Sequence, residues 1–152
     1  MIDRFERFSV AISELSRYLH KIMSAEMEKH GLKGAHSIYL TTMMRFPEGI
    51  TAAQICELCS KDKSDVSRMM NIMEKNGLVV KEGGFQNRYN GVFRLTDAGK
   101  EAAEFVKRRA NLAVSIAGSE LTDENRAIMY SALESTAENM RKISGSGLPD
   151  EE

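Results

Sequence analysis

The chain has 152 residues, 42% of them hydrophobic and 28% charged, with a formal net charge of −1. This is the composition of a soluble globular protein, long enough to bury a core without disulfides or a metal. The two cysteines exclude a disulfide framework, the charged first residues exclude a secretory signal, and no apolar run approaches the ~18 residues of a membrane span. We therefore expect a cytoplasmic protein with no membrane partner.

The first predicted element is a long helix over residues 3–29. Its apolar side chains recur at alternating spacings of three and four, and neither Pro nor Gly occurs before Gly31. This apolar seam comprises Phe5, Phe8, Ile12, Leu15, Leu19 and Ile22. Because such a helix extends ~40 Å, more than a small lobe covers, the seam favours pairing with helices of another subunit. The alternative is an amphipathic helix packed within one subunit.

The centre of the chain predicts a helix-turn-helix. A helix over Ala35–Arg45 stops before a proline, which disfavours helix at the residue preceding it. Thr51 is expected to cap the next helix, Ala52–Ser60. Another helix covers Lys63–Asn76 and ends before Gly77, where a left-handed cap is expected. Two short helices joined by a tight turn form the motif.

A β-hairpin is predicted after the helix-turn-helix. Residues 78–82 and 92–96 read as strands, and the pairs Gly83-Gly84 and Asn90-Gly91 mark turns between them. The expected loop has about nine residues. This hairpin is expected to form a wing beside the two short helices.

Two helices are expected to complete the chain. Thr96 caps a helix over residues 97–117, and Thr122 caps one that ends near Ile143. The tail, residues 144–152, is rich in Gly and Ser and acidic, so disorder is expected.

The order of elements predicts a mainly α fold with a small β-hairpin wing, in the α+β class. The expected architecture is a winged helix-turn-helix lobe at residues 34–96. Helices at residues 1–30 and 97–143 flank this lobe and serve dimerisation. All of these form one domain over residues 1–143.

Polar and apolar side chains separate onto opposite faces of the predicted helix over residues 63–76. The apolar face carries Val66, Met69, Met70 and Met73, and the polar face carries Ser64, Ser67, Arg68, Asn71 and Lys75. Arg binds guanine and Asn binds adenine in a bidentate manner, whereas Ser and Lys hold phosphates. Residues 60–94 include seven basic and four acidic residues, a charge of +3, so the remainder carries −4. This favours major-groove binding to duplex DNA; a solvated polar face is the alternative.

Three short motifs resemble the multiple antibiotic resistance regulator (MarR) family. They are S-D-V-S-R at residues 64–68, M-E-K-N-G-L-V at residues 73–79 and L-T-D-A-G-K at residues 95–100. Family members typically read S-x-V-S-R, L-E-K-x-G-L-[VI] and L-T-x-x-G at this spacing. The resemblance covers the helix order over residues 3–143. It implies a homodimeric regulator on a pseudo-palindromic operator, with Lys63–Asn76 as the recognition helix.

Further DNA contacts are expected from Lys63, at the start of that helix, and from the wing. Arg88 lies near the hairpin tip, where an Arg can enter the narrow minor groove; an exposed loop with one Arg is the alternative. The family wing usually carries D-x-R, but the aligned residues here are Asn87, Arg88 and Tyr89. A shift of one residue can reverse a strand side chain, so Arg94 or Lys81 on the wing strands is a further candidate.

Cys56 and Cys59 form a C-x-x-C motif that allows a second hypothesis. Such a pair can act in thiol redox chemistry, either as a sensor or as a dithiol oxidoreductase. No second cysteine pair or histidine cluster accompanies it, so we expect no metal and no cofactor. Buried structural thiols are the alternative. No P-loop, nucleophile elbow or H-E-x-x-H motif occurs, so we do not expect an enzyme.

The chain contains ten methionines, and a flexible apolar side chain suits an adaptable pocket. In the MarR family the effector cavity lies between the DNA-binding lobe and the dimerisation helices. The resemblance therefore suggests Met23, Met27, Met43 and Met44 as effector-binding candidates; plain core filling is the alternative. The function predicted is a ligand-responsive repressor that binds double-stranded DNA as a homodimer. A winged helix used only for protein contacts is a third hypothesis.

Overall fold

The computed structural model describes residues 3–29, 31–83 and 91–150. The chain forms two compact units, Met1–Ala113 and Val114–Glu152. Within the described ranges, no helix combines the length and apolar character needed to cross a membrane.

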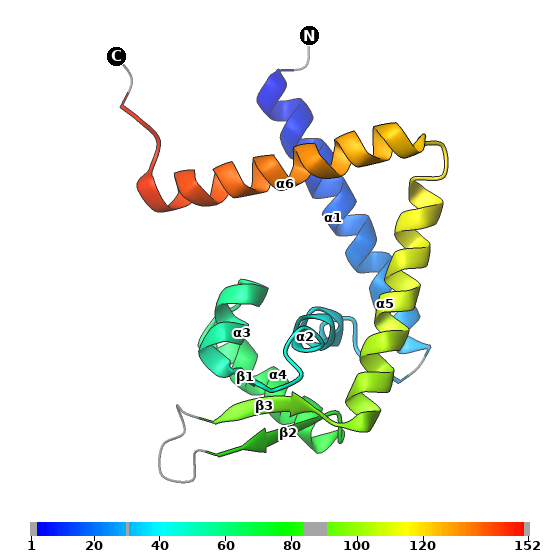
Figure 1. Ribbon diagram of the computed structural model, residues 1–152, viewed down its shortest axis with the longest axis vertical. Helices are drawn as coiled ribbons and strands as arrows, with labels where there is room; N and C mark the ends of the chain where they lie inside the picture. The colour runs from blue at the N-terminus through cyan, green and yellow to red at the C-terminus, as the bar shows by residue number, and fades with distance from the viewer. Residues whose placement is uncertain (1–2, 30, 84–90, 151–152) are drawn as a thin grey trace. The chain divides into compact units, whose positions relative to one another are not determined.

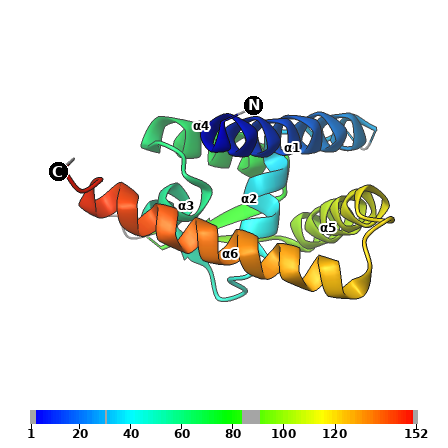
Figure 2. The ribbon, with the colours of Figure 1, turned by 90° about the horizontal axis from the view of Figure 1, so that it is seen from above.

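The first unit is helical and contains a small sheet (Figure 1). Its elements are α1 (Arg4–Glu28), α2 (His36–Met43), β1 (Ile50–Thr51), α3 (Ala52–Cys59), α4 (Lys63–Lys75), β2 (Val79–Glu82), β3 (Val92–Leu95) and most of α5 (Asp97–Ala117). Seen from above, α1 and α5 lie on two sides of this unit and α2 crosses between them (Figure 2). The predicted fold, mainly α with a hairpin, is confirmed.

The sheet has one strand that the sequence analysis did not predict. β2 and β3 form the expected antiparallel hairpin, with Val79 opposite Leu95 and Glu82 opposite Val92. β1 adds to the other edge of β3, which places Ile50 opposite Phe93, and the strand order is β1-β3-β2. A strand of two residues is too short to show the alternation by which strands are recognised in a sequence.

The helix-turn-helix is fixed by caps at its ends. Thr51 and Gln54 form a reciprocal capping box at the start of α3, because each side chain accepts the other's backbone N–H. Asp62 caps α4 by accepting the N–H of Asp65 at 2.8 Å. At the end of α4, Gly77 has a φ of +71°, a conformation that strains residues with a Cβ. The N–H of Leu78 then bonds the carbonyl of Met73, so α4 stops where the sequence predicts.

The core of the first unit contains side chains from each of its described helices and strands. The side chains that are less than 2% exposed include Met27 from α1, Tyr39 and Leu40 from α2, Ile55 from α3 and Val106 from α5. The apolar face of α4 closes the same cluster, as described below. Burial of this apolar surface supplies most of the driving force for folding.

The start of α5 is tied directly to the end of α4. The hydroxyl of Thr96 donates to the carbonyl of Gly77 at 2.6 Å and accepts the N–H of Gly99 at 3.0 Å. The backbone N–H of Thr96 also donates to Leu78. Gly99 permits this approach, because a Cβ there would lie 2.0 Å from the carbonyl oxygen of Leu78. The L-T-x-x-G motif therefore joins the hairpin, α4 and α5 at one point.

The second unit consists of the last turn of α5 and α6 (Asp123–Ser146). Thr122 caps α6 as predicted, accepting the N–H of Asn125. Arg126 fastens the connecting turn by donating to the carbonyls of Gly118 and Leu121, at 3.0 and 3.3 Å.

The helix α6 extends past the predicted end near Ile143. The expectation of disorder from residue 144 was therefore wrong for residues 144–146, which are helical. The hydroxyl of Ser146 donates to the carbonyl of Lys142, and Gly147, with a φ of +79°, ends the helix.

Replacement of Gly99 by Ala is expected to lower the free energy of unfolding by about 1–3 kcal/mol, because the new methyl group overlaps backbone that cannot rotate away. Urea-induced unfolding measures this loss. Gly145→Ala is the matched control, since a Cβ at this position on α6 meets no atom within 4 Å. Equal stability of Gly99→Ala and the parent chain would contradict the close approach.

Candidate nucleic-acid interface

The helix α4 has one buried face and one exposed face. The buried face carries Val66, Met69, Met70 and Met73, each 6% exposed or less. All of the α4 side chains predicted to contact DNA are exposed, namely Lys63, Ser64, Ser67, Arg68, Asn71 and Lys75. The predicted orientation of the helix is therefore observed. The exposed face offers one guanidinium, one amide, two hydroxyls and two ammonium groups to a partner.

Arg68 is held by a neighbouring carboxylate on the same helix. Its Nη2 donates to Oδ1 of Asp65 at 2.6 Å, and the Arg68 side chain remains 69% exposed. The other oxygen of Asp65 accepts the hydroxyl of Tyr39, which is 1% exposed on α2. These two hydrogen bonds, from Tyr39 first and Arg68 second, hold the pKa of Asp65 below its usual value. Burial, and then the Asp65 carboxylate, raises the pKa of the Tyr39 hydroxyl.

Arg68 lies on the predicted reading face, but the contacts that hold it were not predicted from the sequence. The spacing of three between Asp65 and Arg68 could have indicated the ion pair, since such residues are neighbours on a helix. Tyr39 lies 26 positions from Asp65. Only the packing of α2 against the helix-turn-helix brings these two together.

The hairpin contributes two predicted residues within the described part of the chain, Arg94 and Lys81. Nε of Arg94 lies 3.2 Å from Oε2 of Glu82 on the neighbouring strand, and the two form an ion pair. The N–H of Arg94 Nε does not point at this oxygen closely enough for a hydrogen bond. The side chain of Arg94 also passes beside Gly49. Arg88 lies outside the described residues, as does the rest of the hairpin tip. Arg94 is thus engaged with Glu82 before any partner binds.

Cys56 and Cys59 lie in the last turn of α3. Cys59 is buried, and its Sγ donates to Oγ1 of Thr42 at 3.5 Å, whereas Cys56 is half-buried. A reactive dithiol needs an accessible thiolate, and burial of Cys59 does not provide one. Among the residues that the structure describes, no cluster of three metal-ligating side chains is found. The structure thus offers no specific support for the thiol hypothesis.

The central segment of the chain is similar to a known protein family. Residues 30–84, which include α2, α3, α4 and β2, match the MarR family. No curated protein sequence matches the chain. The segment contains the helix-turn-helix and two of the three motifs noted in the sequence, S-D-V-S-R and M-E-K-N-G-L-V.

The central segment of the chain, residues 30–84, therefore resembles the MarR family.

Solved structures of related fold extend this likeness over most of the chain. A MarR transcriptional regulator from Methanosarcina mazei Go1 is 25% identical over 91% of this chain and 99% of that chain, with a TM-score of 0.83. A Listeria monocytogenes protein assigned to the MarR family of transcriptional regulators, in complex with 26mer DNA, is 22% identical over 100% of both chains (TM-score 0.78). A MarR protein from Peptoclostridium difficile DA00132 is 21% identical over 93% and 94% of the two chains (TM-score 0.81).

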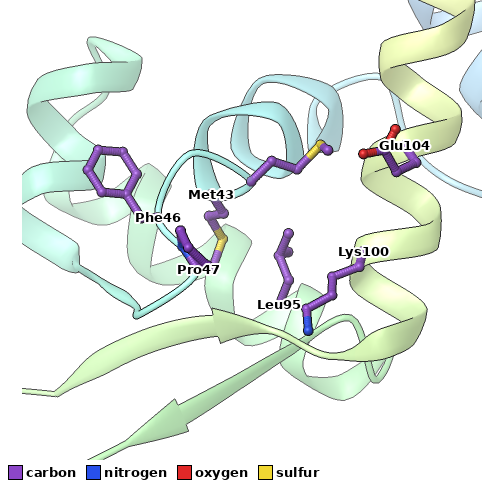
Figure 3. Close-up of a pocket in the computed structure, with 7 residues that line it drawn as sticks. Met43, Phe46, Pro47, Leu95, Lys100 and Glu104 are labelled. Carbon is purple, nitrogen blue, oxygen red and sulfur yellow. The ribbon is translucent and has the colours of Figure 1, made fainter.

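The first unit has a small cavity beside α2. Its volume is about 230 Å³, below the range of about 300–1,000 Å³ that drug-sized ligands occupy. The cavity is lined by Met43, Met44, Phe46, Pro47, Leu95, Lys100 and Glu104. Lys100 and Glu104 enter it from α5, facing Met43 and Pro47 (Figure 3).

The four methionines suggested for effector binding thus separate into two pairs. Met43 and Met44 line the cavity. Met23 and Met27 do not line it and are buried in the core, 6% and 0% exposed; Met43, 2% exposed, is part of the same core. The sequence analysis missed Lys100 and Glu104, whose spacing of four puts them on one side of α5.

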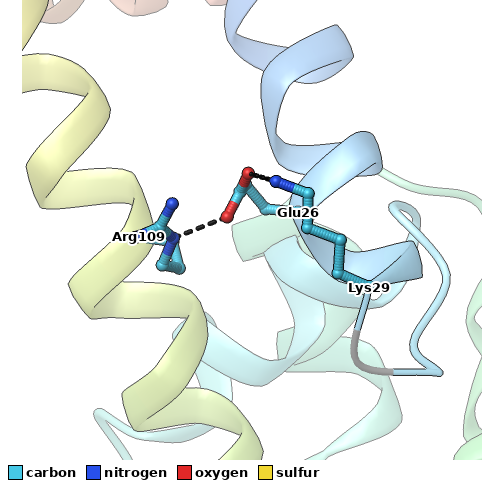
Figure 4. A network of polar contacts seen from close by, with 3 residues as sticks. All are labelled: Glu26, Lys29 and Arg109. Carbon is cyan, nitrogen blue, oxygen red and sulfur yellow. Dashed lines mark hydrogen bonds and ion pairs between the residues drawn. The ribbon is translucent and has the colours of Figure 1, made fainter.

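A polar network links α1 and α5 in the first unit. Glu26 on α1 accepts Nε of Arg109 on α5 at 2.6 Å and Nζ of Lys29 at 2.5 Å (Figure 4). The Glu26 side chain is only 14% exposed. Lys29 first, and then Arg109, lowers the pKa of Glu26 below its usual value.

Because the folded-state pKa of Glu26 is depressed, its contribution to stability is present above the unfolded pKa and is lost as the pH falls through the folded value. Glu26→Gln is expected to melt at a lower temperature than the parent chain at neutral pH. The difference should disappear as the pH falls from about 6 to about 3. Thermal unfolding at several pH values measures it.

Glu28→Gln is the control for this experiment. Glu28 is an exposed carboxylate on the same helix, with no ion pair in residues 3–29, 31–83 or 91–150. A difference between Glu26→Gln and the parent chain that stays constant down to pH 3 would mean that the charge of Glu26 is not responsible.

Proposed function

We propose that this protein is a transcriptional regulator that binds duplex DNA sequence-specifically as a homodimer. The observation that carries the proposal is α4, whose exposed row of Ser, Arg, Asn and Lys lies directly opposite a buried apolar face. The relative from Listeria monocytogenes that was solved with 26mer DNA supports it. As a regulator of transcription the protein would act in the cytoplasm and would be a binding protein rather than an enzyme.

In this proposal, α4 enters the major groove. Arg68 and Asn71 read base edges, because their side chains can make bidentate bonds to guanine and adenine respectively. Ser64, Ser67 and the lysines at positions 63 and 75 contact phosphates and fix the register. Arg88 and Arg94 of the wing would add further contacts to the DNA. Arg94 would first have to release Glu82, its ion-pair partner, in order to bind a phosphate.

Dimerisation is supported by the apolar seam on α1. Every residue of the seam is exposed in the single chain, from 40% for Phe8 and Ile12 to 74% for Phe5. The helix α6 also exposes apolar side chains, namely Ile128, Met129, Tyr130, Leu133, Met140 and Ile143. An exposed apolar surface of this extent favours association. A dimer would present two α4 helices to half-sites about 34 Å apart, hence a pseudo-palindromic operator.

We further propose that a small ligand controls DNA binding and that the outcome is repression. The cavity lined by Met43 and Met44 is apolar on the α2 side and charged on the α5 side, which suits a small amphipathic molecule. Such a ligand shifts DNA affinity only if it binds one conformation better than another. A ligand that raises the melting temperature but leaves DNA affinity unchanged would argue against a regulatory site.

Selection of bound duplexes from a random DNA pool tests the proposed function. The expected result is a motif with two-fold symmetry and half-sites one helical turn apart. The affinity for that duplex should fall steeply as salt rises, since bound phosphates release counterions. Failure to enrich any sequence, or affinity that does not respond to salt, would favour a winged helix used for protein contacts.

Arg68→Ala is expected to weaken binding to the selected duplex by about 1–3 kcal/mol and to relax the preference at one position of each half-site. Arg17→Ala is the control, because Arg17 is similarly exposed (64%) and also forms an ion pair with a carboxylate three residues away. Gel-shift titrations against single base-pair variants of the duplex measure both effects. Unchanged affinity and unchanged base preference would remove Arg68 from the reading residues.

Leu15→Glu is expected to convert the dimer to a monomer, because it places a charge in the middle of the apolar seam. Ser13→Glu introduces the same side chain at an exposed position outside the seam and should leave the dimer intact. Sedimentation velocity distinguishes the two states. A parent chain that sediments as a monomer would contradict the proposed homodimer.

A further inference from the structure

A chain of hydrogen bonds leads from the core of the first unit to the exposed face of α4. Tyr39 is buried on α2, and its hydroxyl donates to Oδ2 of Asp65. Oδ1 of the same carboxylate accepts Nη2 of Arg68 at 2.6 Å. The exposed fraction of the side chains rises along this chain, from Asp65 at 23% to Arg68 at 69%.

The two oxygens of Asp65 thus accept hydrogen bonds from different partners. One is fixed by a hydroxyl that cannot move, because the Tyr39 ring is packed in the core. The other holds one end of a guanidinium that has five N–H donors in a rigid fork. Capping of α4 does not use this carboxylate, since Asp62 supplies the cap. In the part of the chain that the structure describes, the guanidinium of Arg68 has no other hydrogen bond or ion pair, so its remaining donors stay available for a base.

We propose that Asp65, anchored by Tyr39, is a positioning residue that fixes the guanidinium of Arg68 for reading a base edge. This rests on the proposed DNA-binding function and adds a determinant of specificity to it. The residue acts through Arg68 and makes no contact with DNA of its own.

The physical reason is that a free Arg side chain must lose rotational freedom when it docks on a base. Immobilising a long side chain beforehand removes part of that cost from binding. The carboxylate also offsets some of the positive charge of Arg68, so attraction to phosphates of any sequence is lower. Both effects favour the correct base pair over the others. Because Tyr39 and Arg68 keep the pKa of Asp65 depressed, the carboxylate remains charged at neutral pH.

Tyr39→Phe and Asp65→Asn test the proposal, with the duplex selected by the parent protein and its single base-pair variants as probes. Each variant should bind the selected duplex about three- to tenfold more weakly. Affinity for duplexes changed at the position read by Arg68 should stay the same or rise. The preference for the correct base pair at that position alone should therefore fall. Thermal unfolding of each variant confirms that it is folded.

A double-mutant cycle separates positioning from a purely structural role. In the Arg68→Ala background, Tyr39→Phe and Asp65→Asn should have no further effect on DNA affinity, because the group that they position is absent. Tyr18→Phe, which removes a hydroxyl from an exposed ring on α1, is the matched control and should have no effect in either background.

The proposal is overturned if both variants weaken binding equally to every duplex, or if they weaken it as much without Arg68 as with it. Unchanged base preference in both variants would also overturn it while leaving the proposed function intact. If the parent protein selects no duplex at all, the DNA-binding function itself fails, and the positioning role fails with it.

Discussion

The structure depends on the burial of one face of α4. Val66, Met69, Met70 and Met73 lie in the core and are 6% exposed or less. Their positions fix the rotation of the helix about its axis, so the opposite face, with Arg68 and Asn71, must point to solvent. A helix turned by one residue would bury polar groups without partners, at a cost of several kcal/mol. The candidate interface is therefore a consequence of core packing.

The sequence was sufficient to predict α4 and its two faces, because a helical period and a glycine at the expected C-terminal cap, Gly77, are local signals. The same holds for Thr96 and Thr122 as caps. It was insufficient for β1, whose two residues pair only because β3 lies beside them. Nor could it show that Tyr39 meets Asp65, since that contact depends on how α2 packs. The end of α6 was placed too early, because Gly and Ser near residue 145 were read as tail.

The methionines are a further case in which the sequence alone was not sufficient, because their roles depend on tertiary packing. All four suggested for an effector are apolar and lie on or at the end of a helix, and nothing local distinguishes a core position from a cavity wall. Packing makes the distinction: Met27 lies in the core away from the cavity, whereas Met43, also buried, and Met44 border a space that Lys100 and Glu104 line from α5. The charged pair on α5 gives the cavity the polar side that the methionines alone do not provide.

The junction at Thr96 has a mechanical consequence. The hydroxyl of Thr96 bonds both Gly77, just after α4, and Gly99 in the first turn of α5. The backbone N–H of Thr96, at the end of the hairpin, donates to the carbonyl of Leu78. The two segments pack closely at Gly99, since a Cβ there would lie 2.0 Å from the carbonyl oxygen of Leu78. Because of these hydrogen bonds, the first turn of α5 and the C-terminal end of α4 must move together. A displacement of this first turn of α5 would therefore also displace α4, which carries Arg68 and Asn71.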